Sequence, residues 1–568
     1  MQLLGYIFTS VLAISLIALI ASIVMRRKQI AKELSARVDR KSLFALLALL
    51  SFFTAFSLLL VSPVEQLYFD ENIYQGIAMN ILSHGNALWC QYGTGFVHTC
   101  FANSIYHDII GYPFLLAIAF GIFGIGTGTA YALQLLVGAL SILFIFLLAS
   151  MFFERKGAAV AATAIFALIP QLFIWSRTQA IPDLALMSFA TLTFFLFLLF
   201  IRRIRLDSLI TFMSALTLTV YMRIEAILLL PIFFVLFLTY GEEGIRHTIR
   251  HRLTLAIDNL NNNTKLLLAL LGFFMLLMPE IYYLSMQLSN PSYGQDYTNQ
   301  QVFSIANFQN NFPINIQFLL GNYNSITQFP LVFPVETTAL AALGIILLIA
   351  SKRRNRFGML LLPVLWFLAF NLFYGFFYAG AATFGVDDRF MLEMIPALAL
   401  LGGFAISELS AAVGELAKRK YLHHIVYGAI IIGVVIYPFV TLIPNITLKP
   451  TSMPQQTVIY DALSFFYSNY NSVPANCMVF TFTPDLWEEF NRSAAQIDYV
   501  SSTNSQFLND TKNYACRVID YGYWCNVPPN KGTVCKNLLQ NYDLLPLASQ
   551  NNSARGENFA FYQILGKR

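Results

Sequence analysis

The sequence predicts a polytopic α-helical membrane protein with a small extracytoplasmic α/β domain at its C-terminal end. First, its 568 residues are 57% hydrophobic and 11% charged, whereas about 25% of the residues of a soluble domain are charged. Second, the mean hydropathy is +0.62. Third, apolar segments of about 20 residues, enough to cross a bilayer as a helix, alternate with basic loops and stop near residue 445. The net charge of +5, with Lys and Arg gathered between apolar segments, indicates membrane topology and no nucleic-acid partner.

The first apolar segment begins at the N-terminus and is followed by the basic loop RRKQIAKELSARVDRK, residues 26–41. Because Lys and Arg favour the cytoplasmic side of a membrane, we expect Met1 outside and this loop in the cytoplasm. The next apolar segment, 42–61, then leads outward. It delivers Asp70 and Glu71 to the outer face.

Five further basic clusters set the remaining topology: 154–156, 202–205, 246–252, 351–356 and 418–424. Placing all of them in the cytoplasm predicts about 12 spans, the last at 425–443. Three apolar segments lie between Glu71 and Asp183, although two crossings suffice to keep both residues outside. We therefore expect 109–126 to lie on the membrane surface or to be half inserted. The predicted membrane domain is 1–445, and its first extracytoplasmic loop, 65–128, carries juxtamembrane helices.

Residues 446–568 are expected to form the extracytoplasmic domain. The stretches CMVFTF and FAFYQIL read as strands, and PDLWEEFNR as a turn that enters a short helix. Glycosylation sequons suit an exterior location and begin at Asn445, Asn491, Asn509 and Asn551. The six cysteines all lie outside the apolar spans, so disulfides are expected on an oxidising outer side, with Cys90 and Cys100 as one candidate pair.

The stretch YFDENIYQGIAMNIL, residues 68–82, carries the first candidate chemistry. Asp70 and Glu71 directly precede an apolar stripe of helical period, which predicts a helix lying against the membrane surface. Asp70 could simply be the N-cap of this helix. However, adjacent helical residues point about 100° apart, so one carboxylate can reach a substrate while the protein holds the other. A carboxylate beside an acceptor hydroxyl can act as a general base.

Three other outer loops carry charges: Arg177 and Asp183 in WSRTQAIPDLALMSF, Arg223 and Glu225 in YMRIEAILLLP, and Arg389 in GVDDRFMLEMIP. Each has a simpler interpretation, because arginines snorkel at span ends and a nearby Arg and Glu can neutralise each other. Considered as one group at the outer face, these charges suit a phosphate, because arginines bind phosphate and stabilise a departing phosphate. Arg177, Arg223 and Arg389 are therefore the candidate phosphate-binding residues.

At these motifs the sequence resembles membrane glycosyltransferases of the GT-C fold. It is most similar to the branch of dolichyl-phosphate-mannose-protein mannosyltransferases and aminoarabinose transferases. YFDENIYQGIAMNIL resembles the acidic motif of their first loop, and YHDIIGYPFLLAIAFGIFG their proline-containing apolar stretch. SRTQAIPDLAL resembles their Arg-to-Asp motif, and DDRFMLEMIPALALLGG their late span. VFTFTPDLWEEFNRSAAQ resembles the small exterior domain of archaeal and bacterial members, and an archaeal source is expected.

The resemblance implies a polyprenyl (dolichyl) phosphate sugar donor and an inverting transfer to an acceptor on a protein, glycan or lipid. By match, Asp70 is the base, Glu71 its partner and Asp183 the second acidic residue, while Arg177 and Arg389 contact the donor phosphate. Mg²⁺ or Mn²⁺ near the carboxylates is an open alternative, since the mannosyltransferase-like members imply no metal. The sequence departs from the family in its additional first span and in a longer gap between Arg177 and Asp183.

Two other functions compete with a transferase in the cell membrane. A flippase or transporter of polyprenyl-linked sugars would need charges along the middle of several spans. Here most charges lie at the outer ends, and Glu280 and Glu393 are the nearest exceptions. A binding scaffold would act through the C-terminal domain, which shows no catalytic constellation.

Overall fold

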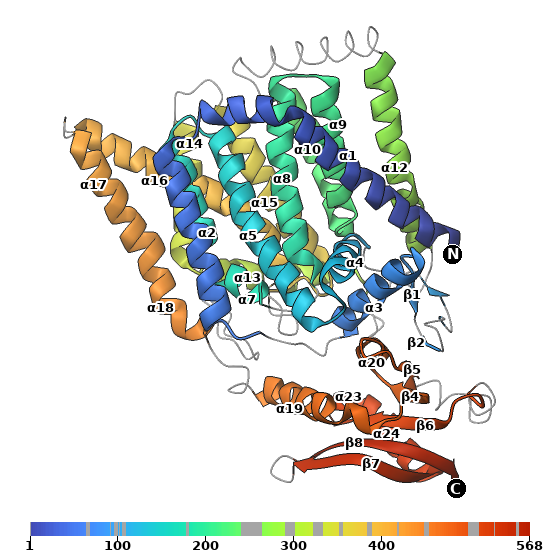
Figure 1. The fold of residues 1–568 in the computed structure, drawn as a ribbon. Coiled ribbons are helices and arrows are strands. Elements are labelled where there is room, and N and C mark those ends of the chain that lie inside the picture. Colours follow the sequence, from blue (N-terminus) through green and yellow to red (C-terminus); the bar gives the residue numbers. More distant parts are fainter. Residues whose placement is uncertain are drawn as a thin grey trace.

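A bundle of apolar helices forms the larger part of the molecule, and a mixed sheet with short helices lies at one end of it (Figure 1). The computed structural model describes residues 2–63, 69–90, 93–95, 100, 103–104, 110–177, 181–239, 264–289, 301–321, 333–350, 356–382, 389–416, 418, 420–447, 454–497, 511–526, 529–552 and 556–568.

Among these residues, eight helical stretches are long and apolar enough to cross a membrane. They are α1 (Gln2–Ser35), α2 (Arg40–Leu60), α5 (Thr127–Phe152), α8 (Pro182–Arg202), α12 (Thr264–Ser289), α15 (Arg356–Phe376), α16 (Ile395–Leu416) with the 3-10 turn before it, and α17 (Lys420–Ile430) continued through a π-helical turn into α18 (Tyr437–Ile446). Each corresponds to a span that the hydropathy pattern predicts.

Shorter apolar helices occupy the positions of the other predicted spans. These are α6 (Lys156–Ala167), extended by α7 (Pro170–Trp175); α9 (Leu206–Val220); α10 (Leu229–Thr239), which follows the 3-10 turn Ile224–Leu228; and α14 (Val335–Ala350). The segment 109–126 forms α4 (Gly111–Phe123), which packs against α3 (Phe69–His84) at the end of the bundle near the sheet (Figure 1). The predicted first loop 65–128 therefore contains two helices, α3 and α4, and their position at the membrane surface stays a prediction.

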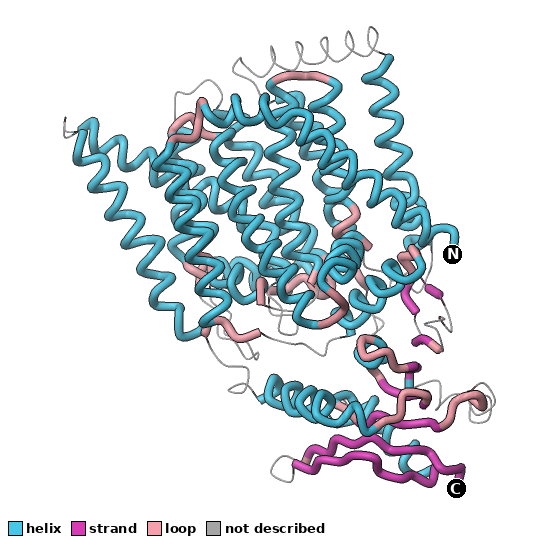
Figure 2. Tube along the Cα trace, viewed as in Figure 1, coloured by secondary structure: helices cyan, strands magenta, loops and turns pink. Residues whose placement is uncertain are grey.

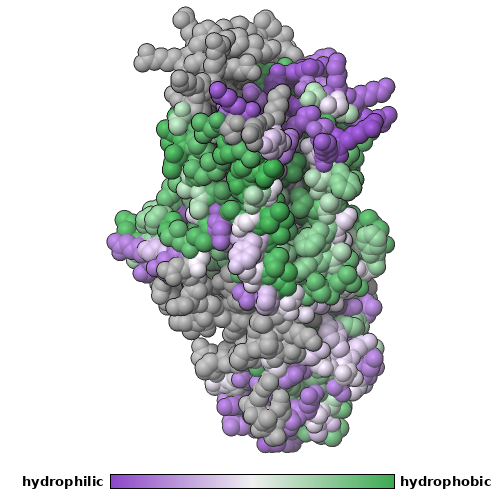
Figure 3. All heavy atoms as spheres, turned by 90° about the vertical axis from the view of Figure 1, so that its left-hand side faces the viewer, coloured by the Kyte–Doolittle hydropathy of each residue, from purple (hydrophilic) through white to green (hydrophobic). Residues whose placement is uncertain are grey.

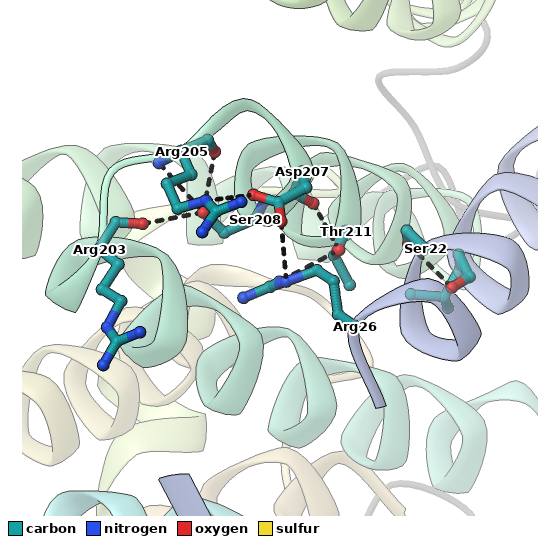
Figure 4. Close-up of polar contacts among 8 residues, drawn as sticks. Ser22, Arg26, Arg203, Arg205, Asp207, Ser208 and Thr211 are labelled. Carbon is teal, nitrogen blue, oxygen red and sulfur yellow. Dashed lines mark hydrogen bonds and ion pairs between the residues drawn. The ribbon is translucent and has the colours of Figure 1, made fainter. Parts of the chain in front are cut away.

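The basic turns predicted in the cytoplasm meet at the end of the bundle opposite the sheet. Arg26 of α1 is 4% exposed, donates to Thr211 Oγ1 at 3.2 Å and faces Asp207 at 3.8 Å (Figure 4). Further ion pairs of 3.2–3.5 Å join these turns: Arg203–Glu33, Arg155–Glu408 and Lys156–Asp39. On the face in Figure 3, an apolar belt separates this polar end from the polar sheet domain. The basic turns at 26–41, 154–156 and 202–205 therefore lie at one end, as the charge pattern predicts, whereas the cluster 246–252 and residues 351–355 lie outside the described residues.

The C-terminal sheet has six strands in the order β2-β5-β4-β6-β8-β7. Strands β4 (Cys477–Thr481), β5 (Ser493–Gln496) and β6 (Cys516–Tyr521) are parallel, while β7 (Tyr542–Asn552) and β8 (Glu557–Lys567) form an antiparallel hairpin. In the described part of this domain, the helices beside the sheet are α19 (Pro454–Asn469), α20 (Pro484–Glu488), α23 (Tyr523–Asn526) and α24 (Pro529–Asn541). The predicted strands are β4 and β8, and the predicted short helix is α20.

One strand of this sheet comes from outside the predicted domain 446–568. Strand β2 (Gly93–Thr94) belongs to the loop after α3 and pairs antiparallel with β5. The same loop contains a small ribbon of β1 (Trp89–Cys90) and β3 (Asn103–Ser104), and the strands of both sheets appear in Figure 2. The structure joins Cys90 to Cys100 in this loop, and Cys477 to Cys516 and Cys525 to Cys535 in the C-terminal domain.

The sheet domain contains a buried carboxyl group that predicts a pH-dependent stability. Asp520 accepts hydrogen bonds from Trp487 Nε1 and Thr481 Oγ1, both at 2.9 Å, and burial raises its pKa to about 6. A carboxyl whose pKa is higher in the folded state contributes stability that is complete below its unfolded pKa and is lost as pH rises through its folded pKa. We expect the free energy that protects the β6 amides from hydrogen exchange, after correction for the intrinsic exchange rate, to fall by up to about 3 kcal/mol between about pH 4 and 6.

Asp520→Asn should remove the contribution of Asp520 to this pH dependence, because the amide cannot ionise, and should leave that of the buried Asp485 and Glu488, whose pKa values burial also raises. Asp543→Asn is the control, since the Asp543 side chain is 61% exposed. If the protection free energy of the β6 amides changed with pH in Asp520→Asn as steeply as in the wild type, another group would be responsible.

Candidate active site

A buried guanidinium between two carboxylates forms the centre of the candidate site. Asp183 lies in the first turn of α8, directly after Pro182 at the first helical position, and is fully buried. Arg223 immediately precedes the 3-10 turn after α9. It donates to Asp183 Oδ1, to Glu225 Oε1 at 2.8 Å and to Glu225 Oε2 at 3.2 Å. The mutual neutralisation considered for Arg223 and Glu225 therefore occurs, and Asp183 joins it.

A second arginine contacts the same aromatic ring as Arg223. Phe390, in the 3-10 turn Arg389–Met394, has the guanidinium carbon of Arg223 at 5.3 Å from its ring centroid and that of Arg389 at 5.1 Å. Cations over a ring face at this range are attracted by its quadrupole. Arg389 is half-buried, whereas the Arg223 side chain is 7% exposed. Arg389 is thus the more accessible of the two.

A third carboxyl group and a tyrosine complete the surroundings of Arg223. Glu393 is 1% exposed and interacts electrostatically with Asp183, Arg223 and Glu225. The ring of the buried Tyr374 lies 4.8 Å from that of Phe390. Sequence reasoning noted Glu393 but assigned it no role. The available signal was a charged residue inside an apolar run, which is typically functional; Phe390 and Tyr374 carried no signal that separates them from core aromatics.

The helix α3 carries Glu71 and packs against α4. Glu71 is 2% exposed and interacts with Tyr112 of α4, whose ring packs edge-on against Tyr74 at 6.4 Å. The N–H of Gly111 donates to the carbonyl of Tyr221 at 2.8 Å, which holds the start of α4 against the end of α9, two residues before Arg223. The backbone of Asp70 lies in the first turn of α3, and its side chain lies outside the described part of the structure.

Arg177 is held apart from the ion cluster. It follows α7, is half-buried, and its Nε donates to the carbonyl of Val61 at 3.3 Å, at the end of α2. Among the described residues no ion pair joins Arg177 to a carboxylate. This contact suits an anchoring role, and its phosphate-binding role stays a prediction.

An apolar groove of about 680 Å³ approaches the site from one side. Its lining is Leu228, Phe303, Ser304, Ile305, Ala369, Leu372, Phe373 and Phe376. Phe303, Ser304 and Ile305 belong to the segment at the start of α13 (Ile305–Leu319), and the others to α15 and the turn after Glu225. Ring contacts lead from Phe303 to Phe377 at 5.5 Å and on to Phe390 at 6.1 Å. The groove and the arginines are therefore linked by one run of aromatic rings.

Within the described ranges, no group of three or more His, Cys, Asp or Glu side chains is placed to hold a metal ion. Arg223 occupies the centre of the carboxylates instead.

Residues 109–283 match the family model for dolichyl-phosphate-mannose-protein mannosyltransferases. No curated protein matches the sequence. The crystal structure of ArnT from Cupriavidus metallidurans in the apo state aligns with a TM-score of 0.55 and 13% identity, over 92% of this chain and 97% of that chain. The structure of the same protein bound to undecaprenyl phosphate aligns with a TM-score of 0.56 and 13% identity, over 93% of this chain and 98% of that chain. A third structure is that of the archaeal oligosaccharyltransferase AglB from Archaeoglobus fulgidus in complex with an inhibitory peptide and a dolichol-phosphate. It aligns with a TM-score of 0.50 and 12% identity, over 92% of this chain and 74% of that chain.

These alignments extend over nearly the whole chain, through both the helical bundle and the sheet domain. At 13% identity they establish the fold, and the matched segment 109–283 contains Asp183, Arg223 and Glu225. The chain is therefore a membrane protein with the GT-C glycosyltransferase fold.

Proposed function

We propose that the protein transfers a sugar, with inversion, from a polyprenyl phosphate-linked donor to an acceptor hydroxyl at the extracytoplasmic face of the cell membrane. One observation carries this proposal: the half-buried Arg389 lies beside the neutralised Arg223 cluster, where the apolar groove meets the run of aromatic rings. An isoprenoid chain suits the groove, because both are apolar. A lipid phosphate suits Arg389, because a guanidinium donates two parallel hydrogen bonds to phosphate oxygens.

The proposed reaction follows from these positions. The acceptor oxygen attacks the anomeric carbon and the carboxylate of Asp70 takes the hydroxyl proton, while the bond from the anomeric carbon to the phosphate oxygen breaks. Polyprenyl phosphate leaves with the bonding electrons, and Arg389 stabilises its developing charge. Arg223 is already shared by Asp183 and Glu225. It therefore fixes the geometry of the cluster near the phosphate.

The orientation rests on the two ends of the bundle. The basic turns gather at one end, which suits the cytoplasm. The opposite end carries the sheet domain and three disulfides, which persist in oxidising compartments. The site and the sheet domain are thus proposed to face the exterior. The lipid phosphates of the ArnT and AglB complexes support the donor class, and a protein, glycan or lipid acceptor remains open.

Purified protein, mixed with a panel of polyprenyl-phosphate hexoses and candidate acceptors, tests this function. We expect release of polyprenyl phosphate that depends on both protein and acceptor. A flippase would instead move labelled donor across liposomes with its glycosidic bond intact. Translocation without cleavage would reject the transferase in favour of that alternative.

Arg389→Gln is expected to weaken donor binding and to slow transfer. Loss of a charged hydrogen-bond donor to phosphate corresponds to about 1.5–3 kcal/mol, or roughly 10- to 150-fold in kcat/KM. Arg389→Lys should recover part of the loss, because it keeps the charge but not the paired hydrogen bonds. Arg203→Gln, which changes an exposed arginine of the opposite end, is the control. Unchanged donor affinity in Arg389→Gln would exclude Arg389 from phosphate binding.

A further inference from the structure

The first loop and the C-terminal domain share one sheet. Strand β2 of the loop pairs with β5 of the domain through Gly93–Ala495 and Thr94–Ala494. Gly93 has a φ of +94°, and a Cβ atom at this position would collide with the carbonyl of Ala494. Glycine is thus required at Gly93 both by its backbone conformation and by the closeness of the neighbouring strand.

A second contact joins the domain to the helix α3 itself. Asp485, in the first turn of α20, is 2% exposed and lies against Gly76 of α3. A Cβ atom at Gly76 would collide with Asp485 Oδ1. The absence of a side chain at Gly76 therefore allows α20 to approach α3 closely. This contact lies about 9 Å along the helix from Asp70, at 1.5 Å per residue.

We propose that the C-terminal domain is a positioning element for the reaction, because it clamps α3 through Gly76 and the loop after α3 through β2, and so holds Asp70 in place. This inference rests on the proposed function of Asp70. The arginines of the donor site lie on other elements, at the turn after α9 and at the turn before α16. Loosening the clamp should therefore disturb the base and spare the donor site.

Two substitutions open the clamp at separate points. Gly76→Leu forces α20 away from α3, and Gly93→Val breaks the pairing of β2 with β5. We expect kcat to fall about 10- to 100-fold, the effect of displacing a reacting group by about 1 Å, with KM for the donor unchanged. Hydrogen exchange should rise in α3 and stay at the wild-type level in α8. Gly556→Val is the matched control, because Gly556 also has a positive φ of 71° but lies in the hairpin at the other edge of the sheet with open space around it.

A crosslink tests the same point in the opposite direction. A Cβ atom at Gly76 would lie 3.4 Å from Asp485 Cβ, close to the roughly 3.5–4.5 Å found across disulfides. The described cysteines are all paired in disulfides, so the double variant Gly76→Cys, Asp485→Cys adds one clean pair. We expect the crosslinked protein to retain wild-type kcat.

The outcomes separate the two proposals. Absence of transfer in the wild type would reject the proposed function. With an active wild type, wild-type kcat in variants whose exchange shows a detached domain would overturn the positioning role. Loss of transfer in the crosslinked protein would also overturn it, because the domain would then have to leave α3 during the reaction.

Discussion

Asp70→Asn is expected to reduce the turnover of sugar transfer by about 100- to 10,000-fold, the usual contribution of a general base. The amide keeps the size of the side chain, so expression and donor binding should stay at wild-type levels. The measurement is release of polyprenyl phosphate under single-turnover conditions, together with equilibrium binding of the donor. The rising limb of the pH–rate profile should disappear in this variant, since it reports the base in its ionised form.

Glu71→Gln is the matched comparison for Asp70→Asn. Glu71 is buried beside Tyr112, so we expect lower thermal stability, a smaller loss of turnover and a pH–rate profile of wild-type shape. Full turnover in Asp70→Asn would show that the base has been assigned to the wrong residue. If Glu71→Gln instead removed the rising limb of the pH–rate profile without lowering thermal stability, Glu71 would be the base and Asp70 its partner.

Arg223→Met is expected to be the most destabilising single substitution in the site. It leaves Asp183 and Glu225 buried without their shared partner, and breaking a buried ion pair on one side costs about 3–5 kcal/mol. Thermal unfolding of the protein in detergent, followed by size-exclusion chromatography, measures the loss. Transfer should fall below detection, because Phe390, which contacts both arginines, would lose the guanidinium of Arg223.

A triple variant separates stability from activity at this cluster. Arg223→Met combined with Asp183→Asn and Glu225→Gln removes all three charges, so much of the stability should return. Transfer should not return, because the cluster beside the donor phosphate has lost its charges. Arg26→Met is the control for the loss of a buried arginine. Arg26 is also buried but pairs with the partly exposed Asp207 at the opposite end of the bundle, so its loss should leave transfer at the wild-type level. Recovery of transfer in the triple variant would exclude the ion cluster from the reaction.

Hydropathy and charge alone determined the membrane part of this protein. A helix that crosses a bilayer must satisfy its backbone polar groups internally, and basic residues choose one side. The apolar helices and the gathering of Arg26 and Arg203 at one end were therefore predictable. So was the presence of charge at Asp70, Asp183, Arg223 and Arg389, because ionised side chains at span ends are costly and stand out.

The partners of these charges depended on the tertiary structure. Arg223 pairs with its near neighbour Glu225, as sequence proximity suggested, but also with Asp183, which is 40 residues away. Arg177, close in sequence to Asp183, contacts Val61 instead. The packing of α8 against α9, and of α8 against the turn before α16, produced this arrangement.

The same holds for the C-terminal domain. The sequence predicted β4, β8 and the short helix α20, because the pattern within one segment reports its own secondary structure. It did not predict that Gly93 of the first loop completes the sheet, or that Gly76 receives Asp485. Local patterns encode which segments are apolar, helical or extended, whereas contacts between distant segments are selected by the packing of the whole chain, and only the folded structure decides them.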